Sequence, residues 1–238
     1  MANTHAAVSF LALGIRRMLV ALLGLVLLYQ AWLFGWVVLW RWTEPGMTRF
    51  MEIRLAELRT GDPRARLKKQ WVDYDRISPN LKRALIAAED ARFLLHDGFD
   101  WAGIRVAMEK NQRSGRIVSG GSTISQQLAK NLFLSPQKTP WRKAQEAAIT
   151  LMLESVWNKR RILEVYLNVI EWGDGVFGAE AAARHYFGVG AARLSPAQAA
   201  RLAGMVPNPR FYDRNRGAPG LAVREALILS RMPSVRFP

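Results

Sequence analysis

The sequence predicts a mainly α-helical domain that follows one membrane-spanning helix. Apolar residues recur at helical spacing in several stretches, and a cap residue followed by proline opens helices at Ser78-Pro79, Thr139-Pro140 and Ser195-Pro196. No stretch alternates convincingly like a strand. With 238 residues, half of them hydrophobic, the chain can bury one sizeable core with a subdomain.

The predicted membrane helix is the segment from Met18 to Trp40, which carries no charge and lies between Arg17 and Arg41. It exceeds the roughly 20 residues that span a bilayer, and also the apolar core of a cleaved signal peptide. A buried globular helix is the alternative, but such helices rarely lack charge on every face. We therefore expect residues 1–17 to be a cytoplasmic tail and 18–40 to be an anchor, because a short N-terminal tail stays inside most simply.

The net charge of the chain limits the classes of partner that it is expected to bind. The formal net charge is +15, and only Arg16 and Arg17 precede the apolar segment, so the domain itself is strongly basic. Such a domain prefers anionic partners, which are nucleic acid, acidic lipid surfaces or phosphorylated substrates. The absence of cysteine excludes disulfides and thiolate metal sites.

Residues 41–70 are mixed in composition and contain a basic run from Arg64 to Lys69. We expect a juxtamembrane linker near the lipid headgroups, with a short helix at Met51–Leu58. An ordinary solvated face explains the basic run equally well. Residues 71–238 then form the domain.

A first polar group accompanies the helix that begins at Ser78-Pro79. Glu89 and Asp90 lie on it, and Gly98 is expected to end it. Neighbouring residues on a helix point in different directions, so the two carboxylates do not form a simple pair. A solvated helix residue is the default interpretation of Glu89, and only the other motifs oppose it.

A second group follows a Gly120-Gly121 approach to a helix N-terminus. Thr123 and Gln126 have capping-box spacing, and free N–H groups at such a terminus can bind an anion. Further along, Gln127 and Lys130 share a face with Thr123. Capping does not explain that shared face, whereas phosphate chemistry would.

The segment 111–121 is rich in glycine and serine and carries two arginines. This composition is typical of a mobile loop, which could close over a substrate. An ordinary surface loop is the alternative.

A third group lies on the helix that starts at Thr139-Pro140. Arg142 and Glu146 are four residues apart, and Lys143 and Glu146 are three apart, so these charges share a face. Surface ion pairs, which contribute little, are the simpler interpretation.

Five blocks in this order resemble the peptidoglycan glycosyltransferases, glycosyltransferase family 51, whose members polymerise lipid II. The blocks are residues 87–100, 120–132, 142–147, 159–168 and 182–188. The similarity spans about residues 71–212, and the short chain with one anchor is similar to the monofunctional members. It implies a lysozyme-like domain over 71–238 with a smaller, membrane-associated lobe.

The resemblance implies an inverting transfer that forms a β-1,4 bond and releases undecaprenyl diphosphate. Glu89 matches the family's essential carboxylate and is the expected general base, since an alcohol needs one at neutral pH. Glu146 matches the second glutamate, and would orient cations, hold a metal or stabilise positive charge on the sugar. The substrate-binding residues expected from the match are Asp90, Phe93, His96, Ser122, Thr123, Gln127, Lys130, Asn131, Arg142 and Lys143.

The resemblance also implies partners and a location. Lipid II, the growing strand, membrane lipids and other cell-wall or division proteins are the expected partners, and nucleic acid is not. The domain would lie on the outer, periplasmic face of the bacterial inner membrane. Some members use a divalent cation such as Mg2+, although no metal-ligand spacing in this sequence indicates one.

Two other functions compete with this hypothesis. A lysozyme-like or lytic transglycosylase could use a single glutamate to cleave peptidoglycan, although a neutral glycosidic bond does not require the cations. A non-enzymatic membrane-anchored binder of acidic lipid or nucleic acid would explain the charge and the anchor, but not the five ordered blocks.

Overall fold

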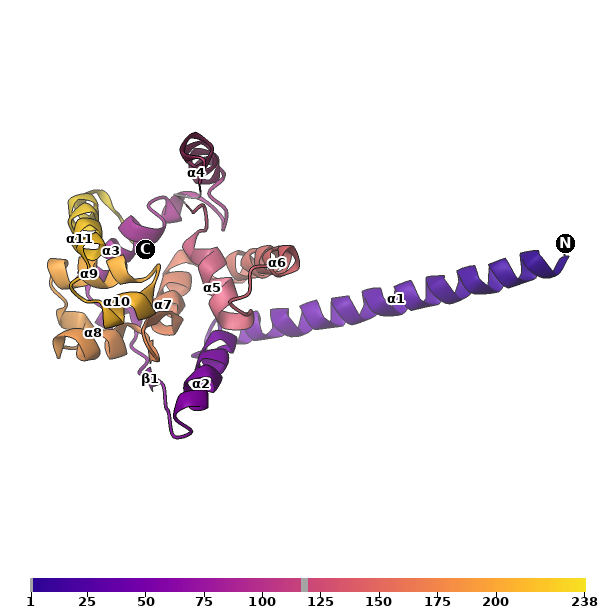
Figure 1. Ribbon diagram of the computed structural model, residues 1–238, viewed down its shortest axis with the longest axis horizontal. Coiled ribbons are helices and arrows are strands. Elements are labelled where there is room, and N and C mark those ends of the chain that lie inside the picture. The colour runs from indigo at the N-terminus through magenta and orange to yellow at the C-terminus, as the bar shows by residue number, and fades with distance from the viewer. Residues whose placement is uncertain (1, 117–119) are drawn as a thin grey trace.

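The computed structural model describes residues 2–116 and 120–238, with side chains from residue 13 onward (Figure 1). Helices form most of it, which confirms the mainly α-helical prediction. The predicted cap-and-proline starts are also confirmed, because Ser78, Thr139 and Ser195 each accept a hydrogen bond from a backbone N–H in the first turn of their helix.

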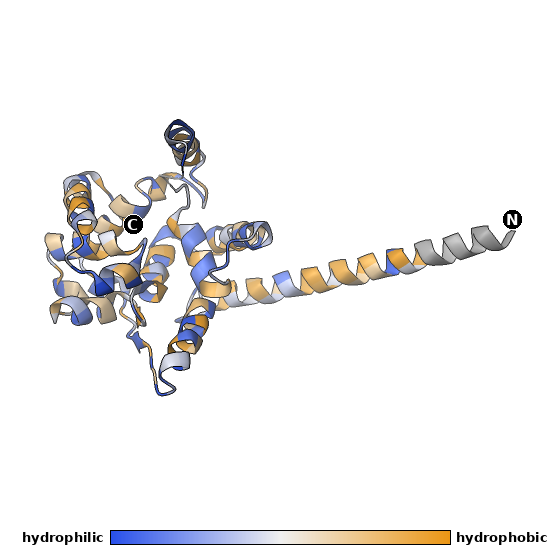
Figure 2. Cartoon of the chain, viewed as in Figure 1, coloured by the Kyte–Doolittle hydropathy of each residue, from blue (hydrophilic) through white to orange (hydrophobic). Residues whose placement is uncertain are grey.

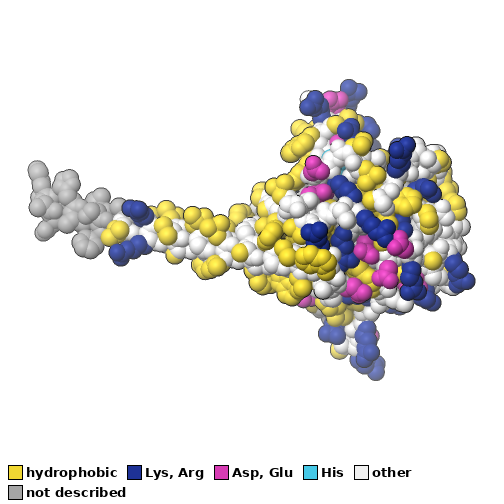
Figure 3. All heavy atoms as spheres, turned by 180° about the vertical axis from the view of Figure 1, so that it is seen from behind, with side chains coloured by type: hydrophobic (Ala, Val, Ile, Leu, Met, Phe, Trp, Pro, Cys, Tyr) yellow, Lys and Arg dark blue, Asp and Glu magenta, His cyan; other side chains and the backbone are white. Residues whose placement is uncertain are grey.

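The N-terminal helix α1, Ala2–Leu39, projects away from the rest of the molecule (Figure 1). Its segment Leu13–Leu39 is long and apolar enough to cross a membrane, and it contains most of the predicted span. Figure 2 shows the hydrophobic character of this helix, and Figure 3 shows hydrophobic side chains continuing from it onto the adjoining part of the domain.

The last turns of α1 are packed against α6, Pro140–Val156. Leu33 and Val37 are buried there, and the indole Nε1 of Trp157 donates to the carbonyl oxygen of Val37 at 2.7 Å. The Gln30 amide donates to Gln145 Oε1 at 2.8 Å. The anchor is therefore fixed to the domain by apolar and polar contacts.

The segment expected to be a linker contains a longer helix than predicted, α2, Arg49–Gly61, which packs against α5. Arg54 on this helix is buried and forms an ion pair with Glu171, with Arg54 Nε 2.8 Å from Glu171 Oε1. A buried, paired arginine fastens the segment to the domain, so at least its helical part does not act as a free tether.

Two groups of helices form the core. The first group packs α3 and α11 against α9, and the second packs α6 and α7 against α5. Their bounds are Pro79–Glu89 for α3, Pro196–Met205 for α9, Pro219–Arg231 for α11, Ile124–Phe133 for α5 and Lys159–Val169 for α7. The first group carries Glu89, and the second carries Lys130, Arg142, Lys143 and Glu146.

A small three-stranded sheet is present, although no stretch of the sequence alternates convincingly like a strand. It orders β1, Lys68–Lys69, beside β3, Val176–Phe177, and then β2, Glu171–Gly173. β1 runs parallel to β3, and β2 runs antiparallel to it. Strands of two or three residues are too short to show an alternating pattern, which is why the sequence does not reveal them.

The remaining helices are α4, Trp101–Ser114, α8, Ala179–Phe187, and α10, Pro209–Arg214. Short 3-10 turns occupy Tyr74–Arg76, Phe93–Leu95, Ala191–Arg193 and Met232–Ser234. Helix α4 projects from the domain (Figure 1) and exposes Trp101 and Met108. Of the predicted mobile loop 111–121, the residues up to Ser114 belong to α4, and residues 117–119 lie outside the described residues.

Candidate active site

Glu89 is the last residue of α3, which ends earlier than predicted. The expectation that the helix continues to Gly98 is wrong, because Asp90 adopts an extended φ of −162°. The Asp90 N–H still bonds the Ile86 carbonyl oxygen at 3.0 Å, and a 3-10 turn at Phe93–Leu95 follows. This early end leaves the Glu89 carboxylate at the tip of the helix.

The Glu89 carboxylate contacts one neutral donor. Gln127 Nε2 on α5 donates to Glu89 Oε2 at 2.7 Å. The Gln127 Oε1 atom in turn accepts from the hydroxyl of Tyr166 at 2.7 Å, so Tyr166 fixes which end of the amide faces Glu89. Burial raises the pKa of Glu89, although the Gln127 hydrogen bond and the positive charges of Arg224 and Lys130 oppose that rise.

A cavity of about 530 Å³ opens in front of this carboxylate, between the two helix groups. From the predicted set, Glu89, Ser122 and Gln127 line it. Its opposite wall comes from α11, through Arg224 and Arg231, which the sequence analysis did not single out. The Nε of Arg224 is buried and has no hydrogen-bond partner among the residues that the structure describes, so it could bond an anionic group.

Lys130 lies one turn beyond Gln127 on α5 and connects the cavity to a second charged group. Burial lowers its pKa, while the negative charges of Glu146 and Glu89 oppose that change. The ammonium group therefore lies within electrostatic range of both glutamates.

The second charged group is built on the first turns of α6. Arg142 Nη1 lies 2.6 Å from Glu146 Oε2, and Lys143 Nζ bonds the other carboxylate oxygen. Glu146 is 4% exposed, so the two cations hold it in a buried position. The predicted i,i+4 and i,i+3 pairs are present, but Glu146 is buried, so they are not the exposed pairs of the simpler interpretation.

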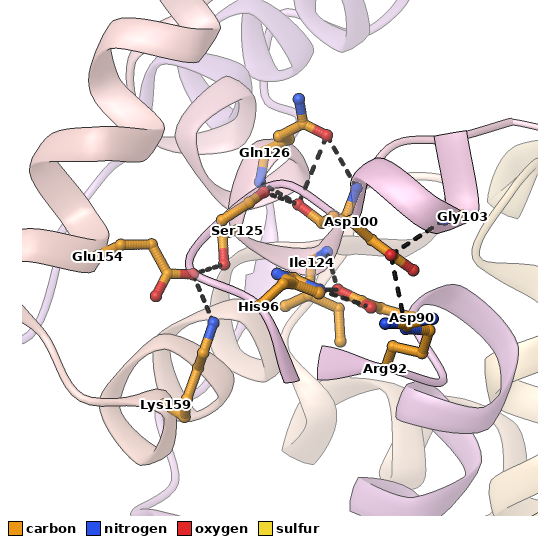
Figure 4. A network of polar contacts seen from close by, with 12 residues as sticks. Asp90, Arg92, His96, Asp100, Gly103, Ile124, Ser125, Gln126, Glu154 and Lys159 are labelled. Atoms are coloured by element: carbon orange, nitrogen blue, oxygen red, sulfur yellow. Dashed lines mark hydrogen bonds and ion pairs between the residues drawn. The ribbon is translucent and has the colours of Figure 1, made fainter. Parts of the chain in front are cut away.

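Asp90 occupies the anion site that we expected a substrate to use. Its Oδ2 accepts from the backbone N–H of Ile124 at 3.1 Å, at the start of α5, and His96 Nε2 lies 3.0 Å from Oδ1 (Figure 4). A carboxylate at a helix N-terminus satisfies free N–H groups and the helix dipole. Asp90 thus joins the end of α3 to the start of α5, and holds Glu89 and Gln127 in register.

A second network lies behind the same helix start (Figure 4). Glu154 Oε1 accepts from the hydroxyl of Ser125 on α5 and, at 2.7 Å, from the ammonium of Lys159 on α7. A Cβ on Gly98, whose φ is +90°, would come within 3.1 Å of the Glu154 side chain. Glu154 therefore packs against the turn after Glu89 and also fixes the first turn of α5.

The other predicted residues support the site from behind. Thr123 is the N-cap of α5 in the predicted capping box with Gln126, and the Asn131 amide donates to the Gln127 carbonyl oxygen at 2.8 Å. Phe93 has no exposed surface, and the Lys159 ammonium lies 4.8 Å from its ring centroid. A side chain this deep packs in the core, and its expected substrate contact stays a prediction.

The carboxylates of the site do not fit a metal held by protein ligands. In the described part of the chain, no three His, Cys, Asp or Glu side chains form a group that could hold a metal ion. Both Glu146 oxygens are already bonded to cations, and Glu89 faces an amide. A Mg2+ site of the usual all-oxygen type needs carboxylates that are free to coordinate.

Two residues that contribute to the site, Tyr166 and Arg224, are not indicated by the sequence, and the reasons differ. Tyr166 has the helical spacing of a core residue and its ring is fully buried, but its hydroxyl donates to Gln127. Arg224 belongs to an ordinary amphipathic pattern on α11, and nothing local marks it. Both contacts link distant parts of the chain, so only the fold reveals them.

The comparisons with known proteins agree with one another on the family to which this chain is similar. A family model described as Transglycosylase matches residues 56–233. A biosynthetic peptidoglycan transglycosylase of Dechloromonas aromatica is 67% identical over 224 residues, which cover 94% of this chain and 97% of that protein. Proteins of the same name from Chromobacterium violaceum and Nitrosospira multiformis are 62% and 58% identical over 222 residues, covering 93% of this chain and 97% and 96% of theirs.

Proposed function

The chain belongs to the transglycosylase family, with its lysozyme-like domain, and we propose that this peptidoglycan glycosyltransferase polymerises lipid II with Glu89 as the general base. The product would be a β-1,4-linked glycan, and undecaprenyl diphosphate would leave. One observation carries the proposal. A desolvated carboxylate faces a cavity that Arg224 and Arg231 also line, and the positive charge of Lys130 acts on that carboxylate.

In the proposed step, the 4-hydroxyl of the acceptor sugar loses its proton to Glu89. Its oxygen bonds to the anomeric carbon of the donor as the bond from that carbon to the diphosphate breaks, which inverts the centre. A raised pKa makes Glu89 a stronger base than an ordinary glutamate and brings it nearer to the operating pH. Gln127 donates to Glu89 Oε2, which leaves Oε1 for the hydroxyl.

The departing diphosphate gathers negative charge, which cations must stabilise. Lys130, Arg142 and Lys143 surround a single carboxylate, Glu146, so their combined charge stays positive. The two pairs support a specific role for Glu146 among the three left open by the sequence. It orients Arg142 and Lys143 toward the leaving group.

The location proposed for the domain follows from the anchor. We expect Leu13–Leu39 to span the membrane once and the domain to lie on the periplasmic face. The exposed apolar residues of α4 and the turn before it, Leu95, Trp101 and Met108, support contact with that face.

Polymerisation of labelled lipid II by the purified full-length protein in detergent tests this proposal. Wild type should form polymer, Glu89→Gln should not, and Glu109→Gln should match wild type because Glu109 is an exposed residue of α4. Cleavage of finished glycan without any polymer would instead establish a lytic enzyme, in which a Glu89 of raised pKa serves as the acid. Equal polymerisation by Glu89→Gln would exclude Glu89 as the base.

A further inference from the structure

A cavity of about 730 Å³ lies between the C-terminal end of α1, the turn that follows it, the start of α2 and the end of α5. Its volume is typical of a site for a small molecule. It shares no lining residue with the cavity at Glu89, and neither Lys130 nor Arg142 lines it. We call this separate space the α1–α2 cavity.

One wall of the α1–α2 cavity is a continuous row of aromatic rings. Neighbouring ring centroids in the row are 5.2 to 6.3 Å apart, in the order Tyr29, Trp32, Trp36, Trp40 and Phe133. Trp32 and Trp36 are exposed, so the rest of the domain does not cover the row. An aromatic belt at a membrane interface needs no such alignment on one face, whereas a rigid aromatic wall suits contact with an alkyl chain.

The other end of the α1–α2 cavity is charged. Glu44, Arg49 and Glu52 line it beyond the last turn of α1, and Arg49 Nη1 lies 3.1 Å from Glu52 Oε2. The charge of Glu44 acts on Lys69, but the ammonium of Lys69 donates to the carbonyl oxygen of Gly46. In a chain of net charge +15, this lining therefore presents two carboxylates and one guanidinium.

The position of the two ends matches an amphiphile at a membrane surface. Most of the aromatic row lies within the apolar segment Leu13–Leu39, at the depth of lipid chains if this segment spans the membrane. The charged end follows that segment directly, at the depth of lipid head groups. A ligand of the α1–α2 cavity would therefore place an apolar chain along α1 and a polar head at the start of α2.

We propose that the α1–α2 cavity binds an aminophospholipid, with its ammonium at Glu44 and Glu52, its phosphate at Arg49 and one acyl chain along the aromatic row. The proposal rests on the proposed membrane location of α1 and is independent of the reaction at Glu89. A zwitterionic head complements this lining better than an anionic one, because two carboxylates repel added negative charge. A primary ammonium also donates hydrogen bonds to carboxylates, which a quaternary choline cannot do.

A lipid in the α1–α2 cavity would contact three elements at once. Figure 1 shows α1, α2 and α5 meeting where the anchor enters the domain, and Leu132 and Phe133 bring the end of α5 into the lining. Helix α5 also carries Gln127 and Lys130. The bound lipid would thus fix the height of the domain above the membrane and support the helix that carries part of the candidate active site.

Photo-crosslinking tests the proposal without any assay of polymerisation. Full-length protein in phosphatidylcholine vesicles receives a small, equal fraction of photoreactive phosphatidylethanolamine, phosphatidylglycerol or phosphatidylcholine, each with a diazirine in the same acyl chain. Phosphatidylethanolamine should label residues 29–40 and 132–133 about threefold more than either other lipid, in keeping with contacts at partly exposed charges. Unlabelled phosphatidylethanolamine should compete for this labelling.

Reversing one charge separates head-group recognition from general damage. Glu44→Lys should lower labelling by phosphatidylethanolamine and raise labelling by phosphatidylglycerol, which reverses the preference. Glu109→Lys makes the same change at an exposed position of α4, away from the cavity, and should keep the wild-type preference. Damage to the domain would instead change labelling by all three lipids alike.

Equal labelling of the cavity by the three lipids would identify ordinary surrounding lipid and overturn the proposal. An unchanged preference in Glu44→Lys protein, or label confined to other parts of α1, would overturn it as well. The outcome is distinct from that of the proposed activity. Selective labelling of protein that makes no polymer would leave the lipid site standing, and polymer without selective labelling would leave only the activity.

Discussion

Glu89 and Glu146 are two glutamates near the same lysine, and their partners differ completely. Glu89 accepts a hydrogen bond from a neutral amide, while Glu146 is held by an arginine and a lysine. Each contributes to the electrostatic environment of Lys130 between them. Burial raises the pKa of the first carboxylate despite Gln127, Arg224 and Lys130, whereas the second is bonded to a cation through each of its oxygens.

This difference separates the two roles. A carboxylate whose pKa is raised by burial accepts a proton readily, and no ion-pair partner among the described residues holds Glu89 in place. A carboxylate bonded on both oxygens by cations is held in place, and it can fix those cations. Replacing each glutamate by glutamine therefore has different consequences for activity and, we expect, opposite consequences for stability.

The largest effect is expected from Glu89→Gln. Loss of the base should reduce polymerisation by at least about 10²–10⁴-fold. The melting temperature at pH 8 should rise, because the neutral amide avoids the desolvation that burial imposes on the ionised carboxylate.

The pH dependence of that stability difference follows from the direction of the pKa shift. A folded-state pKa above the unfolded value stabilises the fold fully below the unfolded pKa, and that stabilisation is lost as pH rises through the folded pKa. The advantage of Glu89→Gln should therefore shrink as pH falls. A variant that melts below wild type at pH 8 would contradict the account of Glu89 as a poorly compensated charge.

Glu146→Gln should have a smaller effect on rate and the opposite effect on stability. Arg142 and Lys143 lose the group that orients them, so polymerisation should fall about 10–100-fold. Loss of the buried partner should destabilise the fold by about 1–3 kcal/mol, a value reduced because Lys143 is half exposed. Denaturant unfolding measures the change, and an unchanged midpoint would show that the pairs hold nothing in place.

Tyr166→Phe tests how the base is positioned. Without its hydroxyl donor, Gln127 is free to turn its amide, and the hydrogen bond that favours ionised Glu89 weakens. We expect kcat to fall about tenfold, equivalent to about 1.4 kcal/mol, and the acid limb of the rate profile to move to higher pH. Tyr186→Phe is the matched control, since that hydroxyl bonds the Trp172 carbonyl oxygen instead. A loss of rate without movement of the acid limb would indicate damage to packing alone.

The smallest effect is expected from Ser125→Ala, which removes one hydrogen bond to Glu154 at the start of α5. The rate should fall by about two- to fivefold, in line with about 0.5–1 kcal/mol for one such bond. Ser155→Ala removes a hydroxyl that bonds Met152 within α6, and should leave the rate unchanged. Identical rates for both variants would show that Glu154 does not position the catalytic helix.

The parts of the fold that the sequence predicts well depend on local chemistry. The starts of α3, α5, α6 and α9 follow from a cap residue, and from proline at three of them, because these contacts lie within one turn. The charge-free segment of α1 is equally local. The end of α3 was missed because Asp90 leaves the helix to meet Ile124, a contact with a distant part of the chain.

The candidate site divides in the same way. Glu89, Gln127 and Lys130 come from motif blocks, and the structure brings them together across the two helix groups. Tyr166 and Arg224 reach the site only through tertiary packing, and the short sheet and the docking of α2 also lack a local signal.

The pH dependence of kcat/KM for lipid II polymerisation tests the central claim most directly, because it reports the protonation of the base in the free enzyme. The account predicts that the rate falls on the acid side with a midpoint above 4.5, the ordinary pKa of glutamate, since burial raises the pKa of Glu89. A rate that stays constant down to that ordinary range would contradict the assignment of Glu89 as a desolvated general base.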